Sequence, residues 1–142
     1  MASSLRFRGR RCAKRRRWVV AVVPKRDHDF IRQLLMSMES ADDWLTVSAL
    51  HMGSNADSQK EYFHMQLLAD QGLVQERGRN GDVYRLTAQG HDYLDSIRDE
   101  GVWSKTKAAV AETGGSASIE IMKQLAMAYL RKQIADRTGL DI

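Results

Sequence analysis

The side chains that most often perform catalysis or bind metals form no recognisable pattern in this sequence. No two of its four histidines are three to five residues apart, so the spacing of a zinc site is missing. The single cysteine, Cys12, forms no internal disulfide and supplies at most one thiolate to a metal. No glycine-rich phosphate loop or nucleophile motif is present. We therefore expect no enzymatic activity, metal or cofactor, and a structural role for His64. The remaining histidines are His28, His51 and His91. A cluster of acidic residues is expected to form a solvated helix face; it consists of Asp92, Asp95, Asp99 and Glu100.

Side chains suited to contacting DNA gather in residues 57–71. Glutamine can hydrogen-bond to adenine edges, and lysine can bind guanine or a phosphate. However, Lys60 is the only cation of this segment and lies among three acids, whereas DNA-reading helices usually carry many basic residues. Tyr62 and Phe63 belong either to the core or to a contact surface for another protein. The candidate DNA-contacting residues here are Ser58, Gln59, Lys60, Tyr62, Phe63 and Gln66.

Three arginines accompany a predicted β-hairpin. Residues 73–77 and 83–87 resemble strands, and Asn80-Gly81 between them is a strong hairpin signal because a type I′ turn needs two positive φ angles. An arginine at the tip can contact a phosphate or enter a minor groove. Alternatively, the turn needs only its Gly and Asn residues, with any solvated residue between them. The candidate DNA-contacting residues of the hairpin are Arg77, Arg79 and Arg85.

Two helices are expected to precede this hairpin. The first begins after an N-cap at Asp27 and ends near Ser40. Residues 45–47 are predicted as one short edge strand, and residues 48–52 are ambiguous between a loop and a helical turn. The second helix begins at Asp57 or Ser58 and ends at Gln71, with Gly72 at a position that favours positive φ.

Three helical segments follow the hairpin. Thr87 caps the first, which runs through Ile97, and a weak point at Gly101 separates it from the second, over residues 102–112. Gly114-Gly115 ends that segment, and the last helix runs from Ser116 or Ser118 to about Arg137. This last helix is apolar around more of its circumference than one packing face needs, so it is either clamped between neighbours or an oligomer interface.

The order of elements predicts a mainly helical fold with a small antiparallel β-hairpin, specifically a winged helix-turn-helix with extra C-terminal helices. Residues 25–100 would form the winged-helix domain, and residues 101–142 would pack on its core or dimerise. A homodimer is favoured, because a two-fold dimer suits a palindromic DNA site.

The positive charge of the chain is concentrated at its start. The formal net charge is +4, but residues 1–24 hold eight Lys and Arg and no acid, whereas residues 25–142 hold 14 basic and 18 acidic side chains. Residues 1–24 are interpreted as a basic extension outside the domain, with three explanations open: a disordered arm that neutralises phosphates, a solvated tail without a role, or upstream sequence read through from an early start site.

No membrane-spanning segment is expected. The longest candidate apolar run, residues 18–23, is six residues long and ends at Pro24, far short of the roughly 20 residues that a membrane helix needs. We expect a soluble, cytoplasmic protein.

Several segments resemble known proteins. Residues 64–74 resemble the junction of recognition helix and wing in bacterial winged-helix regulators. Residues 25–32, 85–95 and 97–100, with Trp103, Thr106 and Lys107, resemble a family of uncharacterised phage, prophage and bacterial winged-helix proteins, whose members usually begin with methionine where this chain has Pro24. This resemblance covers residues 25–134. It implies a winged-helix fold and a mobile-element or phage-defence context, and it supplies no catalytic residues.

Two functions remain open from the sequence. The first is a double-stranded DNA-binding protein, a small transcription regulator or a DNA binder associated with a mobile element or phage defence. The second is a non-catalytic winged-helix module that binds a protein encoded nearby, within a larger defence or toxin-linked complex; the charge of −4 over residues 25–142 favours it.

Overall fold

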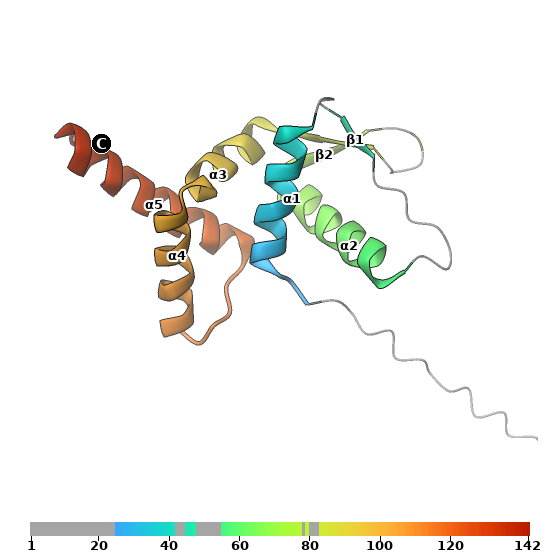
Figure 1. Cartoon of the computed structure of the whole chain (residues 1–142), viewed down its shortest axis with the longest axis horizontal. Coiled ribbons are helices and arrows are strands. Elements are labelled where there is room, and N and C mark those ends of the chain that lie inside the picture. The colour runs from blue at the N-terminus through green and yellow to red at the C-terminus, as the bar shows by residue number, and fades with distance from the viewer. Residues whose placement is uncertain (1–24, 42–44, 48–54, 78, 80–82) are drawn as a thin grey trace, which may run out of the picture.

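The computed structural model describes residues 25–41, 45–47, 55–77, 79 and 83–142. Within these residues the protein has five helices and a small sheet (Figure 1). The predicted mainly helical protein with an antiparallel β-hairpin is therefore confirmed. The elements are α1 (His28–Ser40), β1 (Leu45–Val47), α2 (Ala56–Asp70), β2 (Val74–Arg77), β3 (Val83–Leu86), α3 (Ala88–Arg98), α4 (Glu100–Glu112) and α5 (Ile119–Thr138).

Short polar side chains begin the helices, as the sequence predicts for Asp27 and Thr87, and Ser118 is one of the two predicted starts of the last helix. The side-chain oxygens of Asp27, Thr87 and Ser118 accept hydrogen bonds from backbone N–H groups in the first turns of α1, α3 and α5. These bonds satisfy N–H groups that have no partner inside a helix. The predicted start of α2 is wrong by one or two residues, because Asn55 provides the cap by accepting from the Ser58 N–H at 2.9 Å.

The predicted break between α3 and α4 is also displaced. It lies at Asp99, which has an extended backbone (φ −69°, ψ 127°), while Gly101 belongs to the first turn of α4. Asp99 accepts a hydrogen bond from the Val102 N–H at 2.9 Å, so its carboxylate begins α4 directly after α3 ends. The aspartate, rather than the glycine, therefore sets this boundary.

The strands form a three-stranded antiparallel sheet in the order β1-β3-β2. The hairpin strands pair in register, with Val74 opposite Leu86 and Arg77 opposite Val83, and β1 pairs with the other edge of β3. Gly72, at φ 72°, lies between α2 and β2 and confirms the predicted positive φ. The predicted Asn80-Gly81 turn, the ambiguous segment 48–52 and the basic extension 1–24 lie outside the described residues.

One apolar core joins the helices to the sheet. It is built around fully buried aromatic side chains from β3, α3 and α4, with α1 and α2 packed against them. Helix α5 packs on α3 and α4, and its C-terminal end lies at the opposite end of the view from the hairpin (Figure 1). The largest buried side chains are Trp103, Tyr84, Tyr93, Ile31, Leu35, Met65 and Leu68.

Candidate nucleic-acid interface

Helix α2 holds six of the nine side chains proposed to contact DNA. It turns His64, Met65 and Leu68 toward the core, which leaves the opposite side of the helix partly exposed. On that side Gln59 is exposed, while Tyr62 and Phe63 are half-buried. The aromatic pair is therefore neither fully in the core nor fully in solvent.

The one cation of α2 is held by α1. The Nζ atom of Lys60 lies 3.2 Å from Oδ2 of Asp27 and 4.5 Å from the centroid of the Phe30 ring. The hydrogen bond from the Phe30 N–H, helped by Lys60, lowers the pKa of Asp27 below its ordinary 3.8. The carboxylate is thus ionised at neutral pH and keeps Lys60 against α1, so a DNA phosphate would have to compete with Asp27 for it.

His64 joins α1 to α2 in a structural role. Its side chain is fully buried, Nδ1 donates to the Lys60 carbonyl oxygen at 2.7 Å, and Nε2 accepts from the Asp27 N–H at 2.9 Å. Because a backbone N–H can only donate, the proton must reside on Nδ1. The ring also makes edge contacts with Phe30 and Phe63. Both polar atoms of the imidazole are therefore used within the fold.

Two further candidates are tied to the sheet. Gln66 donates to the Tyr84 hydroxyl oxygen at 2.6 Å. In the hairpin, Arg85 donates from Nε to Oε1 of Gln75 at 2.8 Å, across the β2–β3 pair. These contacts hold both side chains in one place and occupy donors that the sequence leaves available for DNA.

The other two hairpin arginines have a different setting. Arg77, the last residue of β2, and Arg79, just beyond it, are both exposed. Neither makes an ion pair with another described residue. Of the nine candidates, these two present their charge most directly to solvent.

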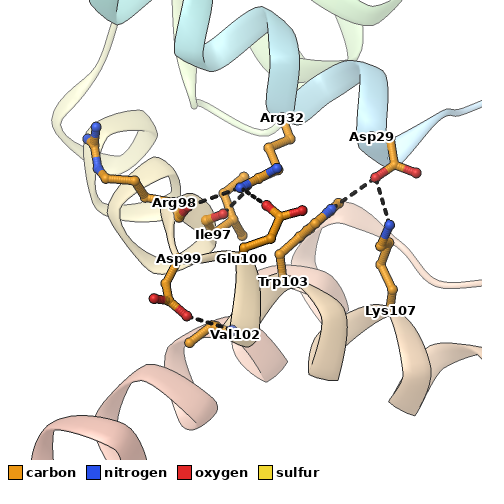
Figure 2. A network of polar contacts seen from close by, with 9 residues as sticks. All are labelled: Asp29, Arg32, Ile97, Arg98, Asp99, Glu100, Val102, Trp103 and Lys107. Atoms are coloured by element: carbon orange, nitrogen blue, oxygen red, sulfur yellow. Dashed lines mark hydrogen bonds and ion pairs between the residues drawn. The ribbon is translucent and has the colours of Figure 1, made fainter.

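A second group of residues, which the sequence associates with a family resemblance, ties α1 to α4 (Figure 2). Asp29 accepts from Nε1 of Trp103 at 2.9 Å and from Nζ of Lys107 at 3.0 Å, and these bonds lower the pKa of Asp29. Arg32 donates to the Ile97 carbonyl oxygen at 2.8 Å and pairs with Glu100 at 2.7 Å. These residues hold helices together, and sequence reasoning missed their pairing because the partners are more than 60 residues apart.

The described residues contain no group of three His, Cys, Asp or Glu side chains placed to hold a metal ion. In the same part of the chain, no helix is both long and apolar enough to cross a membrane.

Comparison with known proteins places the chain in a family. The family described as "Hypothetical protein (DUF2513)" matches residues 25–116. An uncharacterized protein of Haemophilus influenzae is 30% identical over 118 residues, which cover 78% of this chain and 99% of that relative. No solved structure matches the chain significantly. Since the family match spans more than half of the sequence, the chain belongs to the DUF2513 family.

Proposed function

We propose that this protein is a winged-helix DNA-binding protein that holds duplex DNA through its hairpin arginines and reads few bases. Such a protein would serve as a small transcription regulator or as a DNA binder associated with a mobile element or phage defence. The observation that carries the proposal is the exposure of Arg77 and Arg79 beside a hairpin that follows α2 directly.

The arrangement of the sheet supports the winged-helix part of this proposal. β1 pairs with β3 and leaves β2 at the edge, and α2 enters β2 through the turn at Gly72. Arg77 and Arg79, at the described end of this hairpin, are exposed. An arginine there can contact the phosphates beside the groove that α2 faces.

The limited base reading follows from the contacts of α2. Lys60 is paired with Asp27, and Gln66 is bonded to Tyr84, so two of the side chains best suited to base edges are already engaged. Affinity would then come mainly from phosphate contacts, which carry no sequence information directly.

The double variant Arg77→Gln/Arg79→Gln tests this mechanism. Each phosphate contact contributes about 0.9 to the slope of log affinity against log salt, so we expect the slope to become shallower by about 2. Fluorescence anisotropy of the full chain with a labelled duplex, titrated at several salt concentrations, measures this slope. The basic residues 1–24 are present in every variant and cancel in the comparison.

Two controls sharpen the titration. Lys105→Gln/Arg131→Gln removes the same charge from exposed sites on α4 and α5 and should leave the slope close to wild type. Lys60→Gln should also change it little, because that lysine is paired with Asp27. A slope that responds to Lys60 but not to Arg77 and Arg79 contradicts binding through the hairpin.

A second candidate function is a protein-binding module. Asp57 and Asp70 near the two ends of α2 are exposed, and Tyr62 and Phe63, between them in sequence, are half-buried, which suits a protein surface better than a phosphate backbone. Absence of duplex binding at moderate salt, together with co-purification of a protein encoded nearby, would favour this function over the first.

We also propose that the protein is a homodimer through the C-terminal half of α5. Ile134 in that half of α5 is 39% exposed, and Leu140 and Ile142, just beyond the end of the helix, are each 62% exposed. Sedimentation or light scattering of the full chain should give twice the mass of one chain, and Ile134→Glu should give a monomer. Ile121→Glu, at a site near the start of α5 that is 49% exposed, is the matched control and should leave the dimer intact. A monomeric wild-type protein at micromolar concentration contradicts the proposal.

A further inference from the structure

A cleft with a volume of about 460 Å³ lies between the start of α1, the end of α4 and the beginning of α5. This volume lies within the range of small-molecule sites, which is roughly 300–1,000 Å³. The cleft shares Lys60 with the candidate DNA-contacting residues of α2, and it contains none of the residues proposed to contact a second copy. Its lining combines charged residues with apolar ones.

The charge of the lining is positive. The cleft is lined by four basic side chains and two carboxylates, namely Lys25, Arg26, Lys60 and Lys107 with Asp27 and Asp29. Both carboxylates already accept several hydrogen bonds: Asp27 from the Phe30 N–H and Lys60, and Asp29 from Trp103 and Lys107 (Figure 2). Lys25 and Arg26 pair with no carboxylate of the described chain, so the cleft has two positive charges that are not balanced within it.

One wall of the cleft is apolar. Val110 and Met122 line it and are 8% and 1% exposed, and Ala111 also lines the cleft. A surface of this kind favours a ligand with an apolar body over a bare ion, because it removes apolar surface of the ligand from water.

A histidine at the lining has an unsatisfied polar atom. His28 donates from Nε2 to the Ala117 carbonyl oxygen at 3.0 Å, and its buried Nδ1 has no hydrogen-bond partner within the described residues. Burial lowers the pKa of His28 below 6.5, so the ring is neutral at pH 7 and Nδ1 is an acceptor. Such atoms are uncommon in folded proteins.

We propose that this cleft binds a small organic anion, with a phosphate or carboxylate group beside Lys25 and Arg26 and an apolar body against Val110 and Met122. The inference does not depend on DNA binding.

Isothermal titration calorimetry of the full chain at fixed ionic strength tests the proposal with four probes. Phenyl phosphate and benzoate each combine an anionic group with an apolar body, and comparing them decides which anionic group is preferred. Inorganic phosphate has only the charge, and benzyl alcohol has only the apolar body. We expect phenyl phosphate or benzoate to bind more tightly than inorganic phosphate, and benzyl alcohol not to bind.

Variants show whether the binding occurs in this cleft. Lys25→Gln/Arg26→Gln should weaken binding by about tenfold or more, because charge-assisted hydrogen bonds to the anion are lost. Ala111→Phe should abolish binding by filling the cleft without changing its charge. The matched controls Lys105→Gln and Ala108→Phe lie on α4 outside the lining and should bind as wild type does.

Two results would overturn the proposal. One is the absence of binding for both organic anions at millimolar concentration. The other is binding that persists unchanged in both Lys25→Gln/Arg26→Gln and Ala111→Phe. Since no DNA is present in the experiment, its failure is separate from failure of the proposed DNA binding.

Discussion

The variant Gly90→Ala is expected to lose about 3 kcal/mol or more of its free energy of unfolding, a large loss for one methyl group. A Cβ atom at Gly90 would lie 2.0 Å from the Leu73 carbonyl oxygen and 2.8 Å from Cδ1 of Leu86. The carbonyl oxygen cannot easily move, because it accepts hydrogen bonds from the Thr87 N–H at 3.0 Å and the Thr87 hydroxyl at 2.9 Å. Accommodating the methyl group therefore requires α3 to move away from the base of the hairpin.

Helix propensity alone gives the opposite expectation. Alanine is more favourable than glycine inside a helix by about 1 kcal/mol, so propensity alone would make Gly90→Ala more stable than wild type. A loss of stability would show that the close approach to Leu73 outweighs this propensity. Urea unfolding followed by circular dichroism measures the change in the free energy of unfolding. Gly101→Ala is the control: its nearest atom is a side-chain oxygen of Asp99 at 3.0 Å, and its stability should stay within about 1 kcal/mol of wild type. A stabilised Gly90→Ala protein would show that α3 and the hairpin are not packed as described.

The variant Trp103→Ala should have a comparable effect, with a loss of about 3–5 kcal/mol. The indole is 1% exposed and donates to Asp29, while Arg32 and Lys107 each lie 5.7 Å from its ring. Truncation leaves a cavity at the contact between α1 and α4 and removes one of the two side-chain hydrogen bonds that Asp29 accepts. The same urea unfolding experiment measures the loss.

Trp103→Phe separates packing from hydrogen bonding. Phenylalanine keeps much of the apolar volume but lacks the N–H, so the pKa of Asp29 should rise toward its ordinary 3.8. Because folding lowers the pKa of Asp29, its ionisation stabilises the folded protein at pH values above the pKa of Asp29 in the unfolded chain. This contribution is lost as the pH falls through the pKa of Asp29 in the folded protein. The stability difference between wild type and Trp103→Phe should therefore shrink below about pH 4. A difference that is the same at pH 3 and pH 7 contradicts a role for this hydrogen bond.

Local signals in the sequence predict much of the fold. The caps at Asp27, Thr87 and Ser118 and the paired strands on either side of Asn80-Gly81 depend on residues close together in the chain. The boundary between α3 and α4 is predicted less well from Gly101. Asp99 sets this boundary, because its side chain caps α4 and outweighs the weak helix propensity of glycine.

The candidate site could be predicted only in part, because its side chains are used by distant neighbours. The sequence favours Lys60, Gln66 and Arg85 as DNA contacts by residue type. Their partners depend on how α1, α2 and the sheet pack together, and the pair of Lys60 with Asp27 spans 33 residues. Arg77 and Arg79, by contrast, are exposed.

Mapping backbone amide shifts during titration of the full chain with a short duplex tests the central claim most directly. Binding through the hairpin predicts the largest shifts at Arg77, Arg79 and the first turn of α2, with none near residues 131–138. Shifts confined to α5, or an unchanged spectrum at moderate salt, would contradict DNA binding by this surface.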